Sequence, residues 1–198
     1  MNLPNKLTIF RIILVPVMII IPFLGIKGEL YGIPITCLIL DLIFIIASIT
    51  DNLDGYIARS RNQITTFGKF LDPIADKVLV VTAMIMLVEM GRLPAWIPSI
   101  VVFREFIVSG YRLVAVQSSG NVIAANIWGK IKTVTQMIAI ILAFIDINKY
   151  GAIFTEELTA LSFALNLTTT LIMTISVIAT IFSGWEYIKN GKELLKDM

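Results

Sequence analysis

The chain of 198 residues contains no histidine and a single cysteine, Cys37. Without histidine there is no Ser-His-Asp triad, no imidazole base and no histidine-bound zinc. One cysteine cannot form an internal disulfide, a CxxC redox pair or a thiolate metal cage. Any chemistry must therefore use carboxylates, amines, guanidinium groups, hydroxyls or a metal ion that prefers oxygen ligands.

Charged residues are also scarce. They make up only 15% of the chain, whereas a soluble globular domain has about 25%. Hydrophobic residues account for 57%, and the mean hydropathy is +0.88. The chain therefore has too little polar surface for a soluble globule. Its net charge of +2 is too small to indicate a nucleic-acid partner, and we expect none.

The apolar residues form long stretches suited to a bilayer. A membrane-spanning helix needs about 20 mostly apolar residues. Joining the uncharged stretches across Asp41 and Arg104 predicts an all-α integral membrane protein with six transmembrane helices. Residues 2–11 are expected to form a short interfacial segment before the first helix. The expected helices are 12–26, 33–50 with a polar continuation, 76–90, 95–116, 128–148 and 158–186.

The distribution of lysine and arginine predicts the orientation. Six crossings place both termini on one side of the membrane, and twelve of the 16 basic residues fall on that side. Cytoplasmic loops carry the excess of positive charge. We therefore expect a multi-pass protein of the cytoplasmic membrane with both termini and a polar, cytoplasm-facing cavity on the inner side. No linker or repeat divides residues 1–198, which we expect to form a single domain.

Acidic residues are concentrated in one segment, DNLDGYIARSRNQITTFGKFLDPIAD, which contains four of the 14. Asp51 and Asp54 are three residues apart, and Asp72 and Asp76 are four apart, so each pair shares one face of a helix. The polar residues 59–67 suit a short turn between two helices. The sequence therefore predicts that the two pairs of carboxylates meet.

Four converging carboxylates favour a bound cation, because a single Asp at the membrane centre costs about 2.5–3.5 kcal/mol. Oxygen ligands alone favour Mg²⁺, Mn²⁺ or Ca²⁺. Gly55 and Gly68 let a ligand approach the backbone closely, and Arg59 offers a planar fork for phosphate. Pro73 is expected in the first turn of its helix. The alternative is that these acids are solvated helix caps, but ionisable groups in membrane segments are usually functional.

The spacing of these residues resembles the signature of the CDP-alcohol phosphotransferase family. All eight fixed positions of that signature match. The opening NLPNKLTIFRIILVP and the later REF and GKIKT runs are similar to the branch of the family that makes phosphatidylglycerophosphate. The matching pattern is Asp51-x2-Asp54-Gly55-x2-Ala58-Arg59-x8-Gly68-x3-Asp72-x3-Asp76.

This resemblance implies an enzyme of phospholipid biosynthesis that moves the phosphatidyl group of CDP-diacylglycerol to sn-glycerol 3-phosphate and releases CMP. It implies two divalent ions, Mg²⁺ or Mn²⁺, and a homodimer is consistent with it. Asp76 would also serve as the general base. By motif position, the metal ligands would be Asp51, Asp54, Asp72 and Asp76, and the CDP site would be lined by Gly55, Ala58, Arg59 and Gly68.

The acceptor is a dianion and needs a cationic site of its own. Arg104 and Arg112 are eight residues apart and share roughly one helix face, and Lys130 lies on the same side of the membrane. We expect Arg112 and Lys130, with Arg104, to bind the acceptor phosphate. Alternatively, Arg112, Lys130 and Lys132 anchor helix ends among anionic headgroups. An ion pair between Arg104 and Glu105 is not expected, because successive residues do not face each other on a helix.

Other interpretations remain open. The signature binds the shared donor, so inositol phosphate, serine or phosphatidylglycerol are alternative acceptors. A small cation transporter is an alternative of another class, but it would spread its acids through the depth of the membrane. Asn5, Thr8 and Arg11 are three residues apart. They either border the active site or belong to an interfacial cap.

Overall fold

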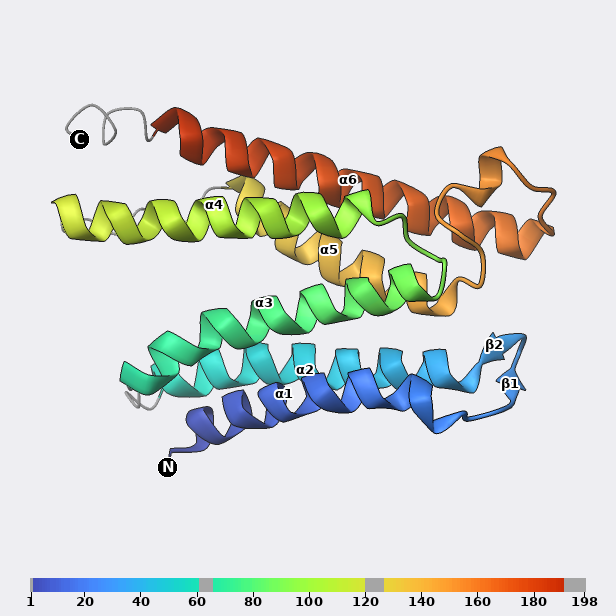
Figure 1. The fold of residues 1–198 in the computed structure, drawn as a ribbon, viewed down its shortest axis with the longest axis horizontal. Coiled ribbons are helices and arrows are strands. Elements are labelled where there is room, and N and C mark those ends of the chain that lie inside the picture. The colour runs from blue at the N-terminus through green and yellow to red at the C-terminus, as the bar shows by residue number, and fades with distance from the viewer. Residues whose placement is uncertain (1, 61–65, 120–126, 191–198) are drawn as a thin grey trace. The chain divides into compact units, whose positions relative to one another are not determined.

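The computed structural model describes residues 2–60, 66–119 and 127–190 (Figure 1). The described chain is mostly helical, as predicted, with two short 3-10 helices and one small hairpin. In chain order the elements are α1 (Leu3–Ile20), η1 (Ile21–Leu24), β1 (Glu29–Leu30), β2 (Ile33–Pro34), α2 (Ile35–Ser60), α3 (Thr66–Glu89), α4 (Trp96–Ser119), α5 (Ile127–Ile145), η2 (Ala152–Phe154) and α6 (Ala160–Asn190).

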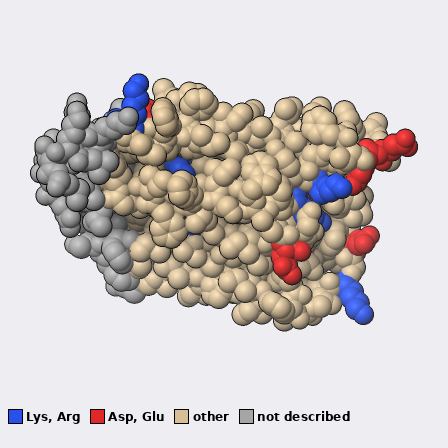
Figure 2. Space-filling view, turned by 45° about the horizontal axis from the view of Figure 1, so that its top comes forward, with Lys and Arg blue, Asp and Glu red and all other residues tan. Residues whose placement is uncertain are grey.

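Three of the described helices are long and apolar enough to cross a membrane. They cover Asn5–Leu24, Ile127–Ile145 and Ala160–Lys189. Large apolar side chains are exposed, among them Phe23 at 83% and Leu161 at 82%. Charged side chains are few on the face that Figure 2 shows. Apolar surface of this extent is suited to lipid, so the chain is a membrane protein.

The first helix begins earlier than predicted. α1 runs without a break from Leu3, with a proline in its first turn, where the missing N–H would lack a helical partner anyway. Residues 3–11 are therefore part of the first helix and not the separate segment that was expected at residues 2–11. Their position at the membrane interface stays a prediction. After Ile20 the chain tightens into η1, and Gly25, with a left-handed φ of 60°, ends it.

A tight hairpin connects η1 to α2. Glu29 pairs with Pro34 and Leu30 with Ile33 in antiparallel register. The two residues between the strands, Tyr31 and Gly32, both have positive φ, at 54° and 80°. This geometry is that of a two-residue turn of type I′, which matches the natural twist of the strands.

The chain divides into two compact units. The N-terminal unit comprises Met1–Leu93 and Ile140–Lys149, and the C-terminal unit comprises Pro94–Ala139 and Tyr150–Met198. In the N-terminal unit, α1 packs against both α2 and α3, and α2 also packs against α3 (Figure 1). Phe44, Leu79 and Leu87 are among its fully buried side chains. The single domain expected for residues 1–198 stays a prediction.

α2 and α3 extend further than their apolar stretches. The polar continuation of α2 is helical through Ser60. α3 begins at Thr66 rather than at residue 76. Pro73 is therefore not in the first turn, as expected, but lies inside α3. Its ring removes the hydrogen bond to the carbonyl four residues earlier. Of the turn predicted over residues 59–67, residues 59, 60, 66 and 67 are helical instead. Residues 61–65 are outside the described part.

A buried arginine caps the end of α5 within the N-terminal unit. Arg92 is 7% exposed, and its Nη1 donates to the carbonyl oxygens of Phe144 at 2.6 Å and Ala143 at 3.4 Å. The last carbonyls of a helix lack partners and carry partial negative charge, so a guanidinium there is favourable.

In the C-terminal unit α4 packs along α6 (Figure 1). η2 is fixed to α6 by side chains: buried Asn166 accepts from the Ile153 N–H, and Thr170 accepts from the Gly151 N–H, both at 3.1 Å. The indole ring of Trp128 stacks on Phe182 with ring centroids 5.1 Å apart. These contacts bring the first part of α5 and the loop before α6 against α6.

Candidate functional site

The acids of the signature lie on two neighbouring helices of the N-terminal unit. Asp51 is on α2, and Asp72 and Asp76 are on α3. All three are partly exposed, which suits groups that meet a ligand. Helical backbone at Asp51 and from Thr66 onward supports the predicted sharing of helix faces at spacings of three and four. Buried Gly68 lies one turn before Asp72.

α1 supplies a polar face to these acids. Asn5, Thr8 and Arg11 are buried, at 8%, 1% and 0% exposure. Thr8 Oγ1 donates to Asp72 Oδ1 at 2.7 Å, and Arg11 Nη1 forms an ion pair with Asp51 Oδ1 at 2.5 Å. α1 thus contacts one acid from each of the other two helices. Thr8 and Arg11 therefore border two acids of the signature. That Asn5, Thr8 and Arg11 border an active site stays a prediction.

These contacts involve one oxygen of each carboxylate. Among the residues whose side chains the structure describes, neither Asp51 nor Asp72 has a partner for Oδ2. A hard divalent cation takes carboxylate oxygens as ligands, so this set of donors fits such an ion chemically. The described side chains contain no group of three or more acids close enough to hold a metal ion by themselves.

Four predicted site residues fall outside this description. Asp54, Gly55, Ala58 and Arg59 lie on the helical backbone of α2. Their side chains are outside the part of the chain that the structure describes. The predicted convergence of four acids and the predicted CDP contacts of these residues therefore stay predictions.

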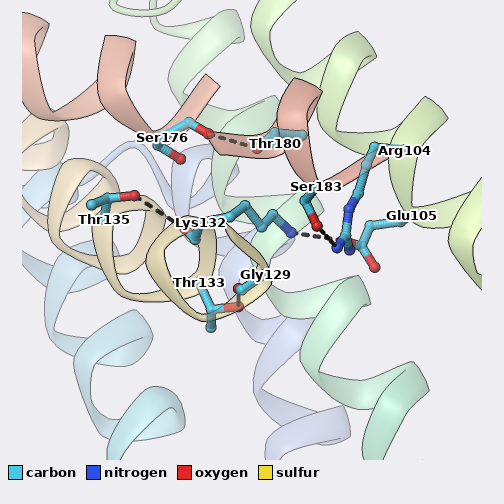
Figure 3. A network of polar contacts seen from close by, with 9 residues as sticks. All are labelled: Arg104, Glu105, Gly129, Lys132, Thr133, Thr135, Ser176, Thr180 and Ser183. Carbon is cyan, nitrogen blue, oxygen red and sulfur yellow. Dashed lines mark hydrogen bonds and ion pairs between the residues drawn. The ribbon is translucent and has the colours of Figure 1, made fainter. Parts of the chain in front are cut away.

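A second polar group lies in the C-terminal unit (Figure 3). We call Arg104, Glu105, Lys132 and Ser183 the Glu105 cluster. Glu105 Oε1 accepts from Arg104 Nη1 at 2.8 Å and from Lys132 Nζ at 2.7 Å. Arg104 Nη2 also donates to the hydroxyl of Ser183. The cluster links α4, α5 and α6, and its three charged side chains are only 9–14% exposed.

The structure corrects the expectation that Arg104 and Glu105 would not pair. Successive residues do point in different directions from a helix axis, but both side chains here are long enough to bend toward the same place. Contacts from α6 help to hold the arginine there. Its Cζ lies 5.9 Å from the centre of the Tyr187 ring, within range of a cation–π interaction.

The other predicted acceptor residues are less fully described. Lys130 is exposed on α5. Lys132, which the sequence indicated only as an alternative headgroup anchor, is instead buried and paired in the Glu105 cluster. The side chain of Arg112 lies outside the described part. A signal for Lys132 was present in the sequence, because residues 130 and 132 point to different sides of a helix. Sequence alone did not show which side is buried.

Comparison with known proteins identifies the chain's relatives. A model of the CDP-alcohol phosphatidyltransferase family matches residues 1–182. The CDP-diacylglycerol–glycerol-3-phosphate 3-phosphatidyltransferase of Bacillus subtilis (strain 168) is 44% identical over 202 residues, covering 98% of this chain and 97% of the relative. The enzymes of the same name from Haemophilus influenzae and Rickettsia bellii are 38% and 36% identical. These matches cover 99% and 97% of this chain and 96% of each relative. These matches confirm the resemblance that the signature indicated.

Proposed function

The chain belongs to the CDP-alcohol phosphatidyltransferase family, and we propose that it transfers the phosphatidyl group of CDP-diacylglycerol to sn-glycerol 3-phosphate, giving phosphatidylglycerophosphate and CMP. The observation that carries this proposal is the placement of the family signature. Its described acids lie on α2 and α3, and Thr8 and Arg11 of α1 each contact one of them. Relatives that match over nearly their full length carry the corresponding enzyme name.

The acids hold the metal ions of the reaction. The family generally uses divalent metal ions. We assign two ions, Mg²⁺ or Mn²⁺, to Asp51, Asp54, Asp72 and Asp76. Such ions supply positive charge for the attacking and leaving oxygens of a phosphoryl transfer. Arg11 and Thr8 keep one oxygen of Asp51 and one of Asp72 engaged, which fixes the direction of the other oxygen.

The chemical step exchanges one phosphorus–oxygen bond for another. A hydroxyl oxygen of glycerol 3-phosphate attacks the lipid-bearing phosphorus of the donor, and the bond to CMP breaks with its electron pair going to CMP. Asp76 accepts the proton of the attacking hydroxyl, because a carboxylate within hydrogen-bond reach can act as a general base. Gly55, Ala58, Arg59 and Gly68 line the CDP site, and Arg59 binds the diphosphate as a planar fork.

The acceptor phosphate needs separate cations, which we assign to Arg104, Arg112 and Lys130. Arg104 is the best described of these. It is held among Glu105, Ser183 and Tyr187 in the C-terminal unit. A guanidinium with a fixed position binds a phosphate with a smaller loss of conformational entropy than a free side chain.

We place the six helices across the cytoplasmic membrane, with the acids and both termini on the cytoplasmic side. Support comes from the three apolar helices and from the distribution of basic residues along the sequence. The acyl chains of the donor stay in the bilayer, so the donor enters sideways and its CDP headgroup reaches the acids. A homodimer of such chains is compatible with this arrangement.

One experiment tests the reaction and the acceptor together. Purified protein is supplied with CDP-diacylglycerol, Mg²⁺ or Mn²⁺, and separately with glycerol 3-phosphate, inositol phosphate, serine or phosphatidylglycerol. Mass spectrometry of the lipid product should show phosphatidylglycerophosphate. A different product would refute the acceptor assignment. Failure to release CMP with every alcohol would refute the transferase and favour a cation transporter.

A second experiment tests the metal site. Asp72→Asn keeps the shape and removes the charge, and should lower CMP release about 100-fold or more, because a lost ligand misplaces the ion. Mn²⁺ binding, followed by electron paramagnetic resonance, should weaken in the same variant. Glu157→Gln, which changes an exposed acid in the C-terminal unit, is the control. Near-full activity of Asp72→Asn would contradict the assignment.

A further inference from the structure

The Glu105 cluster carries more positive than negative charge in a mostly buried place. Arg104 and Lys132 contribute two positive charges and Glu105 contributes one negative charge. The guanidinium and ammonium nitrogens lie 2.8 and 2.7 Å from the same oxygen, so they are at most 5.5 Å apart. Two cations are held this close only because one carboxylate lies between them.

α6 provides both space and a hydrogen-bond acceptor for the side chain of Arg104. α6 has a glycine, Gly184, beside the arginine, and a Cβ at that position would lie 3.3 Å from Arg104 Cγ. Ser183 on the same helix accepts from Nη2. The Nε atom of Arg104 is buried and has no hydrogen-bond partner among the described residues. The guanidinium is therefore fixed in place and retains an unused donor.

An ion pair made only for stability would need no second cation. Buried pairs contribute little net stability, and apolar replacements of similar size are often as stable. A net positive charge with an unused donor in a low-dielectric place instead favours an anion. In the proposed reaction the acceptor brings a phosphate that requires cations.

We infer that Glu105 is a positioning residue, which holds Arg104 and Lys132 side by side so that they bind the phosphate of the acceptor. This inference rests on the proposed function and extends it in two ways. It adds buried Lys132 to the acceptor site, and it gives the only carboxylate of the cluster a role. Glu105 acts through the two cations and does not itself contact the acceptor.

The test measures binding of glycerol 3-phosphate to the full-length protein without the lipid donor. Equilibrium dialysis with radiolabelled glycerol 3-phosphate gives Kd for the wild type and for Glu105→Gln. Without the negative charge Arg104 and Lys132 repel each other and separate. Kd should therefore rise about tenfold, which corresponds to one misplaced charge-assisted hydrogen bond. Glu105→Asp, which keeps the charge, should recover part of the loss, and Glu157→Gln should bind like the wild type.

Kinetics distinguish this role from a purely structural one. In Glu105→Gln the KM for glycerol 3-phosphate should rise, while the KM for CDP-diacylglycerol stays close to the wild-type value. The Tm should fall, because two mostly buried cations lose their carboxylate partner, so Kd and KM are compared in the folded fraction. A lower Tm with an unchanged Kd in the folded fraction would overturn the inference. If Glu105→Gln does not fold, Ser183→Ala replaces it. A rise of about threefold in Kd is then expected, for one lost neutral contact, and an unchanged Kd overturns the inference.

The outcomes separate this inference from the proposed function. If the wild type binds glycerol 3-phosphate in a Glu105-dependent way but releases no CMP with it, the proposed reaction fails and the positioning role stands. If the wild type makes phosphatidylglycerophosphate while Glu105→Gln keeps the wild-type Kd and KM, the reaction stands and the positioning role fails.

Discussion

At the scale of single residues, side chains of α1 contact two acids of the family signature. Arg11 is fully buried in an apolar helix, and its ion-pair partner Asp51 has a side chain that is 32% exposed. Burying a guanidinium is unfavourable unless a charged partner compensates. Arg11 is therefore expected to hold Asp51 in position for the ligands of the site.

Replacing this arginine tests that role. Arg11→Gln should lower the free energy of unfolding by about 1–3 kcal/mol, because it removes an ion pair whose acidic partner is partly exposed. It should also lower CMP release about tenfold or more, because Asp51 loses its fixed orientation. Thermal unfolding and a CMP release assay measure the two effects. Lys6→Gln, which changes an exposed residue of α1, is the control, and equal behaviour of the two variants would contradict the prediction.

The residue scale also shows where sequence reasoning succeeds and fails. The four acids of the signature were found from the sequence, because their number and spacing can be read there and charged residues are few in the rest of the chain. The sequence did not identify the partners of Thr8 and Arg11. A spacing of three residues shows that side chains share a helix face, but it does not show which residues they contact. The pairing of Glu105 with Arg104 and Lys132 was missed, because it depends on packing among three helices.

At the scale of secondary structure, the order of the helices was predicted and several ends were not. α4, α5 and α6 begin and end within four residues of the expected positions. Their apolar stretches are flanked by charged residues or by loop segments, which mark the helix ends in the sequence. α1 and α3 begin nine and ten residues early. The prediction was based on hydrophobicity, but polar residues such as Asn, Lys and Thr also continue a helix.

Two glycines in the helices of the C-terminal unit allow a matched comparison. A Cβ at Gly110 on α4 would meet nothing within 4 Å, whereas one at Gly184 on α6 would press on the side chain of Arg104. Gly110→Ala should therefore raise the free energy of unfolding by about 0.5–1 kcal/mol through helix propensity alone. Gly184→Ala should gain less or lose stability, because the contact at 3.3 Å offsets that gain.

Thermal unfolding of the two variants in the same detergent measures this difference. The substitution at Gly184 should also raise the KM for glycerol 3-phosphate, since it displaces Arg104. Equal stabilisation by both alanines would show that α6 does not pack closely on the arginine.

At the scale of the whole molecule, composition alone predicted the membrane and the family supplied the reaction. The scarcity of charge made the four acids conspicuous, and the lack of histidine left carboxylates and oxygen-bound ions for the chemistry. Topology is a different matter. The helices are visible in the structure, but their direction through the bilayer depends on where the positive charges lie along the chain.

Labelling of single cysteines tests that direction. Cys37 is buried, so Cys37→Ser provides a background without reactive thiols. On it, Tyr31→Cys in the hairpin and Lys149→Cys before η2 should react with a membrane-impermeant maleimide in intact cells, because the orientation places both outside. Lys6→Cys and Lys130→Cys should react only after permeabilisation, because positive loops stay in the cytoplasm. All four positions are exposed, so accessibility within the protein does not explain a difference. The reverse pattern would place the acids on the outer face, away from cytoplasmic glycerol 3-phosphate, and would contradict both the orientation and the supply of the proposed acceptor.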